Sequence, residues 1–192
     1  MKGSLLVREI LPFYASLAVL LGAALLLDAV LHLVDAVWIG RWLGIPGVLL
    51  ILGSFGHSLR KRKIIRSGNP IKYLRLHERM GWAGSLLVLV HAGIHFNAVL
   101  AWLALVAMLI NVTSGLTGKY LLQRAQRWLR EARTQMREAG AQSEEIELEL
   151  YWDSLAFDLV KQWRKVHLPI ALAFAVLALA HIVAVFLFWS WR

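Results

Sequence analysis

Long apolar runs recur along this chain, and they constrain its fold more than any other feature. An apolar run of about 18 residues is long enough to cross the hydrocarbon core of a bilayer as a helix. Hydrophobic residues make up 59% of the 192 residues, whereas soluble domains typically contain about 45–50%. We therefore expect an all-α integral membrane protein whose surroundings are a lipid bilayer.

The apolar runs predict five transmembrane helices in one membrane domain over residues 1–192, with a cytoplasmic helical insert between the fourth and the fifth. Lys2 and Arg8 precede the first run, as they would in a signal peptide, but that run is too long for the hydrophobic region of such a peptide. It is therefore interpreted as a retained first helix. The predicted helices cover residues 9–31, 43–59, 77–100, 101–122 and 166–189, and the insert covers residues 123–165.

Basic residues indicate how these helices are oriented. With five spans, 19 of the 21 Lys and Arg residues fall on the side that holds the N-terminus, the 60–79 loop and residues 119–165. Loops rich in Lys and Arg stay in the cytoplasm. The N-terminus is therefore expected to be cytoplasmic and the C-terminus outside, in a prokaryotic cell (inner) membrane. The basic loops are interpreted as topology determinants that bind anionic lipid headgroups, and no nucleic-acid partner is expected.

The insert contains two predicted helical segments, separated at Gly140. In the first segment five arginines recur at intervals of three or four residues, which places them along one side of a helix: Arg124, Arg127, Arg130, Arg133 and Arg137. Ser143 is predicted to cap the second segment, whose apolar side carries Tyr151 and Trp152. The insert is interpreted either as a docking surface for a redox partner or as an amphipathic helix that lies on the membrane surface.

Four histidines form two pairs with the same spacing. His77 and His91, in the third predicted helix, are 14 residues apart, and so are His167 and His181 in the fifth. Fourteen residues return a helix to within about 40° of its starting direction, roughly 21 Å further along. Because the two helices run in the same direction, we expect His77 to lie opposite His167 and His91 opposite His181.

This arrangement is typical of b-type haem held between helices. Neutral imidazoles from two facing helices fill both axial positions of a haem iron, so the pairs predict two haem b groups with irons about 20 Å apart. No residue is predicted to be catalytic. Gly84, with Gly81 and Gly93, would let the flat ring approach the backbone. Cations near the cytoplasmic pair would contact the haem propionates: Lys72, Arg75, Arg79, Arg164 and Lys165.

The remaining histidines have no partner at matching spacing. His32 and His57 are interpreted as packing residues. His95 follows His91 by four residues, so it is an alternative ligand or an auxiliary group that bonds a propionate or a quinone oxygen or transfers protons. His91 with His95 could also form a small metal site, but no carboxylate lies near to complete it. The absence of cysteine excludes thiolate metal sites and covalently attached c-type haem.

The paired histidine spacing, together with the basic loop before the third predicted helix, resembles the ferric reductase-like transmembrane domain, the family of ferric reductases and NADPH oxidases. It is also similar to the dihaem core of quinol-oxidising cytochrome b. The resemblance implies that His77 and His167 ligate an inner haem, and that His91 and His181 ligate an outer one. The chain departs from both patterns, because it ends after the fifth predicted helix without flavin or nicotinamide domains and lacks a Pro-Glu-Trp-type quinol motif.

These features predict an electron-transfer subunit of a larger oxidoreductase rather than a complete enzyme. Electrons would pass between a cytoplasmic flavin or iron–sulfur protein, or the quinone pool, and an acceptor across the membrane, such as a multihaem or iron–sulfur partner. The alternative is a transporter or proton-conducting protein that uses membrane histidines without haem. That alternative calls for more acids inside the membrane than the chain has, since only Asp28 and Asp35 lie towards the outer half.

Overall fold

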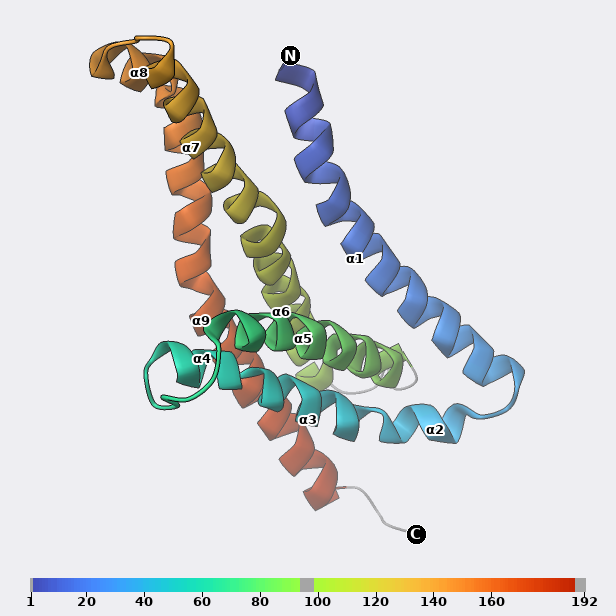
Figure 1. Cartoon of the computed structure of the whole chain (residues 1–192). Helices are drawn as coiled ribbons and strands as arrows, with labels where there is room; N and C mark the ends of the chain where they lie inside the picture. The colour runs from blue at the N-terminus through green and yellow to red at the C-terminus, as the bar shows by residue number, and fades with distance from the viewer. Residues whose placement is uncertain (1, 94–98, 189–192) are drawn as a thin grey trace. The chain divides into compact units, whose positions relative to one another are not determined.

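The computed structural model describes residues 2–93 and 99–188, and the side chains within these ranges except those of residues 2–10, 121–125, 156, 159–160 and 163–164 (Figure 1). Over the described ranges the chain forms helices joined by short connections and contains no strand, which confirms the predicted all-α class. The helices are α1 (Lys2–Leu33), α2 (Val37–Trp42), α3 (Gly44–Ser54), α4 (Gly56–Lys61), α5 (Pro70–Gly93), α6 (Val99–Leu116), the π-helix η1 (Thr117–Leu122), α7 (Gln123–Glu138), α8 (Ser143–Glu149) and α9 (Tyr151–Phe188).

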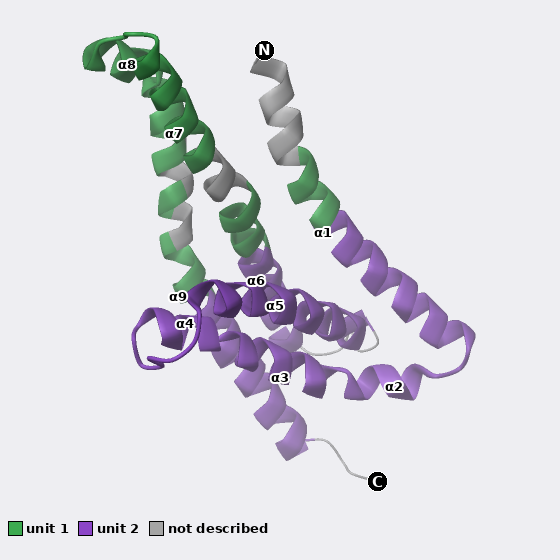
Figure 2. Cartoon of the chain, viewed as in Figure 1, with its two compact units in different colours: residues 1–16, 113–170 green, residues 17–112, 171–192 purple. Residues whose placement is uncertain are grey.

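The chain divides into two compact units (Figure 2). Unit 1 comprises Met1–Ser16 and Thr113–Ile170, and unit 2 comprises Leu17–Val112 and Ala171–Arg192. Each unit is therefore described by itself below.

Four segments in the described part of the chain are long and apolar enough to cross a membrane: Leu11–Leu33, Val37–Lys61, Val99–Tyr120 and Lys165–Phe188. These segments support the prediction of a membrane protein. The third predicted span, 77–100, is not among them, because α5 carries charged residues through its first half and residues 94–98 lie outside the description. A bundle of five spans therefore stays a prediction.

Helix α5 begins at Pro70, seven residues before the predicted start at His77. Asn69 accounts for this earlier start, because its side-chain Oδ1 accepts the N–H of Ile71 at 2.8 Å and so caps the first turn. Proline is favoured at the first helical position, where its missing N–H costs nothing. Gly68 precedes the cap with φ +87°, a conformation that suits glycine. His77 therefore lies two turns inside α5 rather than at its beginning.

Helix α9 likewise begins at Tyr151 rather than near Val166, so the end of the insert and the last predicted span form one helix of 38 residues. The change from polar to apolar sequence at Val166 marks a change of surroundings, and nothing there breaks the helix. Pro169 lies inside α9, where a proline removes one backbone hydrogen bond. The predicted second span, 43–59, is interrupted, because α3 ends at Ser54 and α4 begins at Gly56.

The insert folds as a helical hairpin of α7, α8 and the start of α9 within unit 1 (Figure 2). Its own apolar core consists of Leu129, Ile146 and Leu150, all at least 94% buried. Gln142, rather than the predicted Ser143, is the N-cap of α8, and its backbone N–H donates to Oε2 of Glu145 at 3.1 Å.

In unit 2, α3 and α5 pack in antiparallel directions through very small residues. Gly47 and Gly84, which face each other, show why small residues are needed there: a Cβ added to Gly84 would lie 2.8 Å from the carbonyl oxygen of Gly47. Small residues let helix backbones approach closely in a membrane. A second contact region in this unit consists of Ala104 and Met108 of α6 with Phe174 of α9, and Val88 of α5 packs against it.

We predict that Gly84→Ala destabilises the protein, because the added methyl group would meet the backbone of α3 and the side chain of Ile51. Overpacking of this kind costs about 1–3 kcal/mol. The measurement is the free energy of unfolding in mixed micelles titrated with dodecyl sulfate, followed by circular dichroism.

Gly81→Ala is the matched control, since nothing lies within 4 Å of a Cβ at Gly81 in the same helix. This substitution should be neutral or stabilise the helix by up to about 1 kcal/mol. Equal loss of stability in both variants would contradict the close contact between α3 and α5.

Candidate cofactor site

Two of the predicted ligands lie on the α5 face that packs against α2 and α3. His77, Gly84 and His91 are spaced by seven residues on α5, and Gly40, Gly47 and Ser54 are spaced by seven on the facing segment. The antiparallel pairs are His91 with Gly40, Gly84 with Gly47, and His77 with Ser54. We call this row of three pairs the α3–α5 seam.

At each end of the seam a histidine donates to a backbone carbonyl. Nδ1 of His91 lies 3.2 Å from the carbonyl oxygen of Gly40, and Nδ1 of His77 lies 3.1 Å from that of Ser54. Gly40 and Ser54 each lie in the last turn of a short helix, where carbonyl groups lack the N–H donor that a continuing helix would supply. The carbonyl oxygen of Gly40 also accepts the N–H of Leu43, at 3.2 Å. The ends of α2 and α3 therefore supply the acceptors for the two histidines, and of these only Ser54 lies inside the second predicted span, 43–59.

These bonds select the tautomer of each ring. A carbonyl oxygen only accepts, so Nδ1 must carry the proton, and in the neutral imidazole Nε2 then keeps its lone pair. Histidines that bind metals usually donate their other ring N–H to a carbonyl or carboxylate in this way, which orients the ring. The side chains of His77 and His91 thus have the hydrogen bonding expected of metal ligands.

His91 and His181 lie close together in unit 2. Their ring centres are 6.5 Å apart and their planes are inclined by 62°. Two imidazoles that bind one metal ion through bonds of about 2 Å hold their ring centres roughly 6 Å apart. His181 reaches this position because it lies seven residues after Phe174, on the side of α9 that packs against α6 and α5. The distance between the two rings fits a pair of axial ligands.

The ring of His91 also packs against Gly44. A Cβ at Gly44 would lie 2.9 Å from Cδ2 of that ring, so only glycine leaves the space that the imidazole occupies. Gly44 is the first residue of α3, and it therefore helps to hold the ring in place.

His77 and His167 belong to different units, so their predicted pairing stays a prediction. Within unit 1, His167 lies beside α6, with Cε1 3.7 Å from the position of a Cβ at Gly115. Ser114, next to Gly115, is 98% buried. The π-helix η1 follows directly after Leu116, and single π-helical turns occur often at functional sites.

His57, which the sequence leaves as a packing residue, is adjacent to a predicted ligand. Its ring centre lies 5.7 Å from that of His77, with the planes inclined by 30°. This contact depends on the antiparallel register of α4 with α5. Sequence spacing within one helix does not predict that register. His32, in contrast, has a local role, since Nδ1 contacts the carbonyl oxygen of Asp28 in its own helix at 2.8 Å.

The other predicted site residues differ in their exposure and in their neighbours. Arg75 and Arg79 lie exposed on α5, two residues before and after His77, and Lys165 lies exposed in unit 1. The side chain of Arg164 and all of His95 lie outside the described residues. Gly84, the predicted haem-packing glycine, faces Gly47 and Ile51, so α3 fills the space next to it instead of a flat ring.

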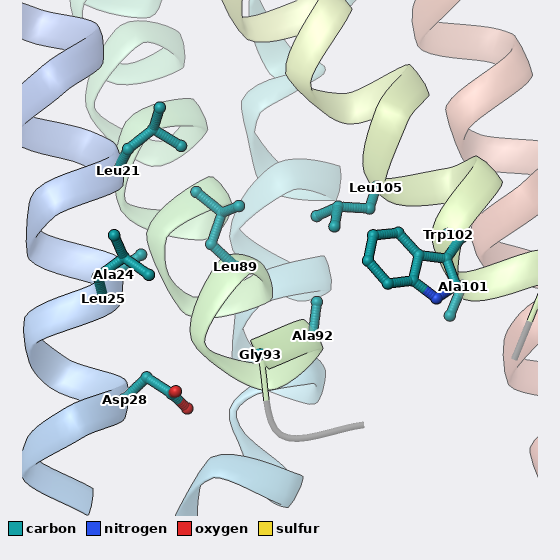
Figure 3. A pocket seen from close by; sticks show the side chains of 10 residues that line it. All are labelled: Leu21, Ala24, Leu25, Asp28, Leu89, Ala92, Gly93, Ala101, Trp102 and Leu105. Carbon is teal, nitrogen blue, oxygen red and sulfur yellow. The ribbon is translucent and has the colours of Figure 1, made fainter. Parts of the chain in front are cut away.

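A cavity of about 300 Å³ lies on another side of α5 in the same unit (Figure 3). It is lined by Leu21, Ala24, Leu25, Asp28, Leu89, Ala92, Gly93, Ala101, Trp102 and Leu105, which come from α1, α5 and α6. Figure 3 shows the side chain of Asp28 extending from α1 towards Gly93 at the end of α5.

Comparison with protein-family models, with curated proteins and with solved structures finds no match to this chain. Among the described side chains, no group of three or more His, Asp or Glu residues is placed to hold a metal ion. An axial pair of histidines differs from such a group, because a porphyrin supplies four further nitrogen ligands. The argument for function therefore depends on the two-histidine geometry.

We predict that His91 and His181 can be cross-linked through cysteines in the intact chain. The natural sequence has no cysteine, so the double variant His91→Cys/His181→Cys carries a unique pair. A short bismaleimide should join the two, because the ring centres of the two histidines are 6.5 Å apart. Mass spectrometry of the digested protein measures the linked peptides.

The control pair is His77→Cys/His181→Cys. His77 lies roughly 21 Å along α5 from His91, so the same reagent should not join it to position 181. Cross-linking of the control pair, or failure of the first pair, would contradict the position of α9 beside α5.

Proposed function

We propose that the chain is a membrane electron-transfer subunit that binds two b-type haems, one between His91 and His181 and one between His77 and His167. The observation that carries this proposal is the approach of His91 to His181, with ring centres 6.5 Å apart. Haem would supply one-electron chemistry at these positions. We expect no catalytic role for the chain's own side chains beyond ligation and orientation.

The protein's own contribution is to present two neutral imidazoles in fixed orientations. The carbonyl groups of Gly40 and Ser54 hold the proton on Nδ1 of His91 and His77, so that Nε2 is the ligating atom. Since both histidines belong to one helix, their separation along α5 sets the distance between the two cofactors. The exposed cations Arg75 and Arg79 flank His77, where propionates would need partners.

The proposed topology has five spans, with α5 and the residues after it as the third. The N-terminus would then be cytoplasmic and the C-terminus outside, in a prokaryotic cell (inner) membrane. Segregation of 19 of the 21 Lys and Arg residues to one side supports this topology. Electrons would pass between a cytoplasmic redox protein or the quinone pool and an acceptor across the membrane.

A second candidate function is proton conduction through membrane histidines without haem. The contact between His57 and His77 favours it, because two imidazoles on neighbouring helices can pass a proton. Nδ1 of His57 is buried and has no hydrogen-bond partner among the described residues. This candidate predicts colourless protein and a pH-dependent proton flux in vesicles.

Of the two interpretations of the insert, the structure of its hairpin favours partner docking rather than a position on the membrane surface. Opposite its core, α8 and the start of α9 expose four apolar side chains: Leu148, Tyr151, Trp152 and Leu155, of which Leu148 and Trp152 are at least 75% exposed. Residues 139–160 contain six acidic residues and no Lys or Arg. Anionic headgroups repel such a segment, whereas an exposed apolar patch marks a protein contact. The partner's complementary surface would be basic.

We predict that the purified chain shows a reducible b-type absorption spectrum with two haems. His91→Ala and His181→Ala should each remove one haem and leave the other, because each substitution removes one axial ligand of the same iron. The measurement is haem per chain together with the spectrum before and after dithionite.

His32→Ala is the control, and it should keep both haems, since Nδ1 of His32 bonds to the carbonyl oxygen of Asp28 in its own helix. Haem-free protein from cells with ample haem supply would exclude the proposal and favour the proton-conducting alternative. Retention of two haems in both ligand variants would show that the pairing is wrong.

We predict that the exposed face of the hairpin is in water. A spin label on Trp152→Cys in the otherwise cysteine-free chain, held in a lipid nanodisc, should be accessible to a water-soluble nickel chelate and shielded from oxygen dissolved in the bilayer. Accessibility is measured by power saturation in electron paramagnetic resonance.

Leu179→Cys provides the opposite reference, because Leu179 is 62% exposed within the apolar part of α9. Its label should respond to oxygen and not to the chelate. The same response from the label at position 152 would place the hairpin on the membrane and refute the docking role.

A further inference from the structure

The cavity between α1, α5 and α6 has the composition of a binding site for a small apolar ring. Its volume of about 300 Å³ lies at the lower end of the range typical of small-molecule sites. Nine of the ten lining residues are Leu, Ala, Gly or Trp, and the remaining one is Asp28 (Figure 3). A pocket that is apolar with one polar anchor fixes the orientation of its ligand through that anchor.

Asp28 is an unusual residue for this position. It lies in Leu11–Leu33, one of the candidate membrane spans, where carboxylates are rare and usually functional. Its Oδ1 atom is buried and has no hydrogen-bond partner among the described residues. His32, one turn further, uses Nδ1 on the backbone carbonyl of Asp28 and stays 3.8 Å from Oδ1. The side chain of Asp28 as a whole is 25% exposed, so its carboxylate keeps an accessible part that a bound donor can use.

Because Gly93 has no side chain, it leaves room for the carboxylate of Asp28. A Cβ at Gly93 would lie 3.2 Å from Oδ1 of Asp28, so the side chain of Asp28 packs directly on the α5 backbone. The sequence predicts Gly93 as a residue that accommodates haem, and in the structure it accommodates Asp28 instead. The cavity is thus built from both sides, with the acceptor on α1 and the glycine on α5.

We propose that this cavity binds the ring of a lipid-soluble hydroquinone, with a ring hydroxyl donating to Asp28. The apolar lining selects an uncharged flat ring, and the buried acceptor oxygen selects a ligand that brings a donor. Two of the three helices that line the cavity belong to candidate membrane spans, which favours a ligand that dissolves in lipid.

The position of the cavity suits a redox-active ligand. Ala92 and Gly93 line it and directly follow His91. His91 donates to Gly40 of α2, whereas Ala92 and Gly93 contact the cavity between α1 and α6. A ring in the cavity would be separated from the His91–His181 pair by a single helix. The choice of a hydroquinone rests on the proposed electron-transfer function.

The test measures binding of trimethylhydroquinone to the purified full chain in nanodiscs, under anaerobic reducing conditions, by saturation-transfer magnetic resonance and equilibrium dialysis. Asp28→Asn keeps the shape of the side chain and removes its charge. It should weaken binding roughly tenfold, because the amide oxygen still accepts a hydrogen bond but forms a weaker one than a carboxylate does. The dimethyl ether of the same ring, which has no donor, should bind weakly to both proteins.

Asp35→Asn is the matched control, because Asp35 is exposed in the turn after α1 and does not line the cavity. It should bind the hydroquinone as the natural chain does. Ala101→Phe fills the cavity from α6 without touching the carboxylate, and it should also abolish binding. Circular dichroism verifies that each variant is folded.

Three results would overturn the inference: no binding of the hydroquinone to the natural chain, unchanged binding by Asp28→Asn, or Asp28-dependent binding of dodecylammonium with none of the hydroquinone. Haem content is measured on the same samples, so the two proposals fail separately. Hydroquinone binding without haem would reject the proposed function alone, and two haems without hydroquinone binding would reject this inference alone.

Discussion

The close approach of α3 to α5 is the contact on which the rest of unit 2 depends. Gly47 and Gly84 bring the two backbones together. With the helices this close, the histidines at either end of the seam reach carbonyl groups of the neighbouring segment. The glycines thus act on the candidate site indirectly, because they set the helix separation at which His77 and His91 can donate their Nδ1 protons.

Different sides of helix α5 contribute to the α3–α5 seam and to the cavity. One side forms the seam and presents His91 towards His181. Another side closes the cavity over Gly93, where Asp28 packs. Because both features occur within one turn of the same helix, a ligand in the cavity and a cofactor at the histidine pair would be close without sharing residues. This arrangement is compatible with electron transfer between them.

The hairpin in unit 1 has a different physical character. Its interior is a small apolar core around Leu129 and Ile146. Its exposed apolar residues lie in a segment, residues 139–160, that contains six acids and no Lys or Arg, and Arg133 of α7 donates to Ser154 of this segment at 3.3 Å. Along the sequence, the arginines of α7 and the acids of α8 and the start of α9 concentrate opposite charges in different segments of one hairpin. A basic partner and anionic lipid would therefore favour different segments of it.

Sequence alone determined the helical class and four candidate membrane spans, because both follow from the length and spacing of apolar residues. The remaining predicted span, 77–100, stays a prediction. Sequence also placed His91 and His181 as a pair, and the structure brings these two rings together. Only the tertiary structure decided the other contacts. The pairing of His57 with His77, the acceptor roles of Gly40 and Ser54, and the position of Asp28 over Gly93 all join different helices. Spacing within one helix carries no information about the register between two helices, and that register decides which side chains meet.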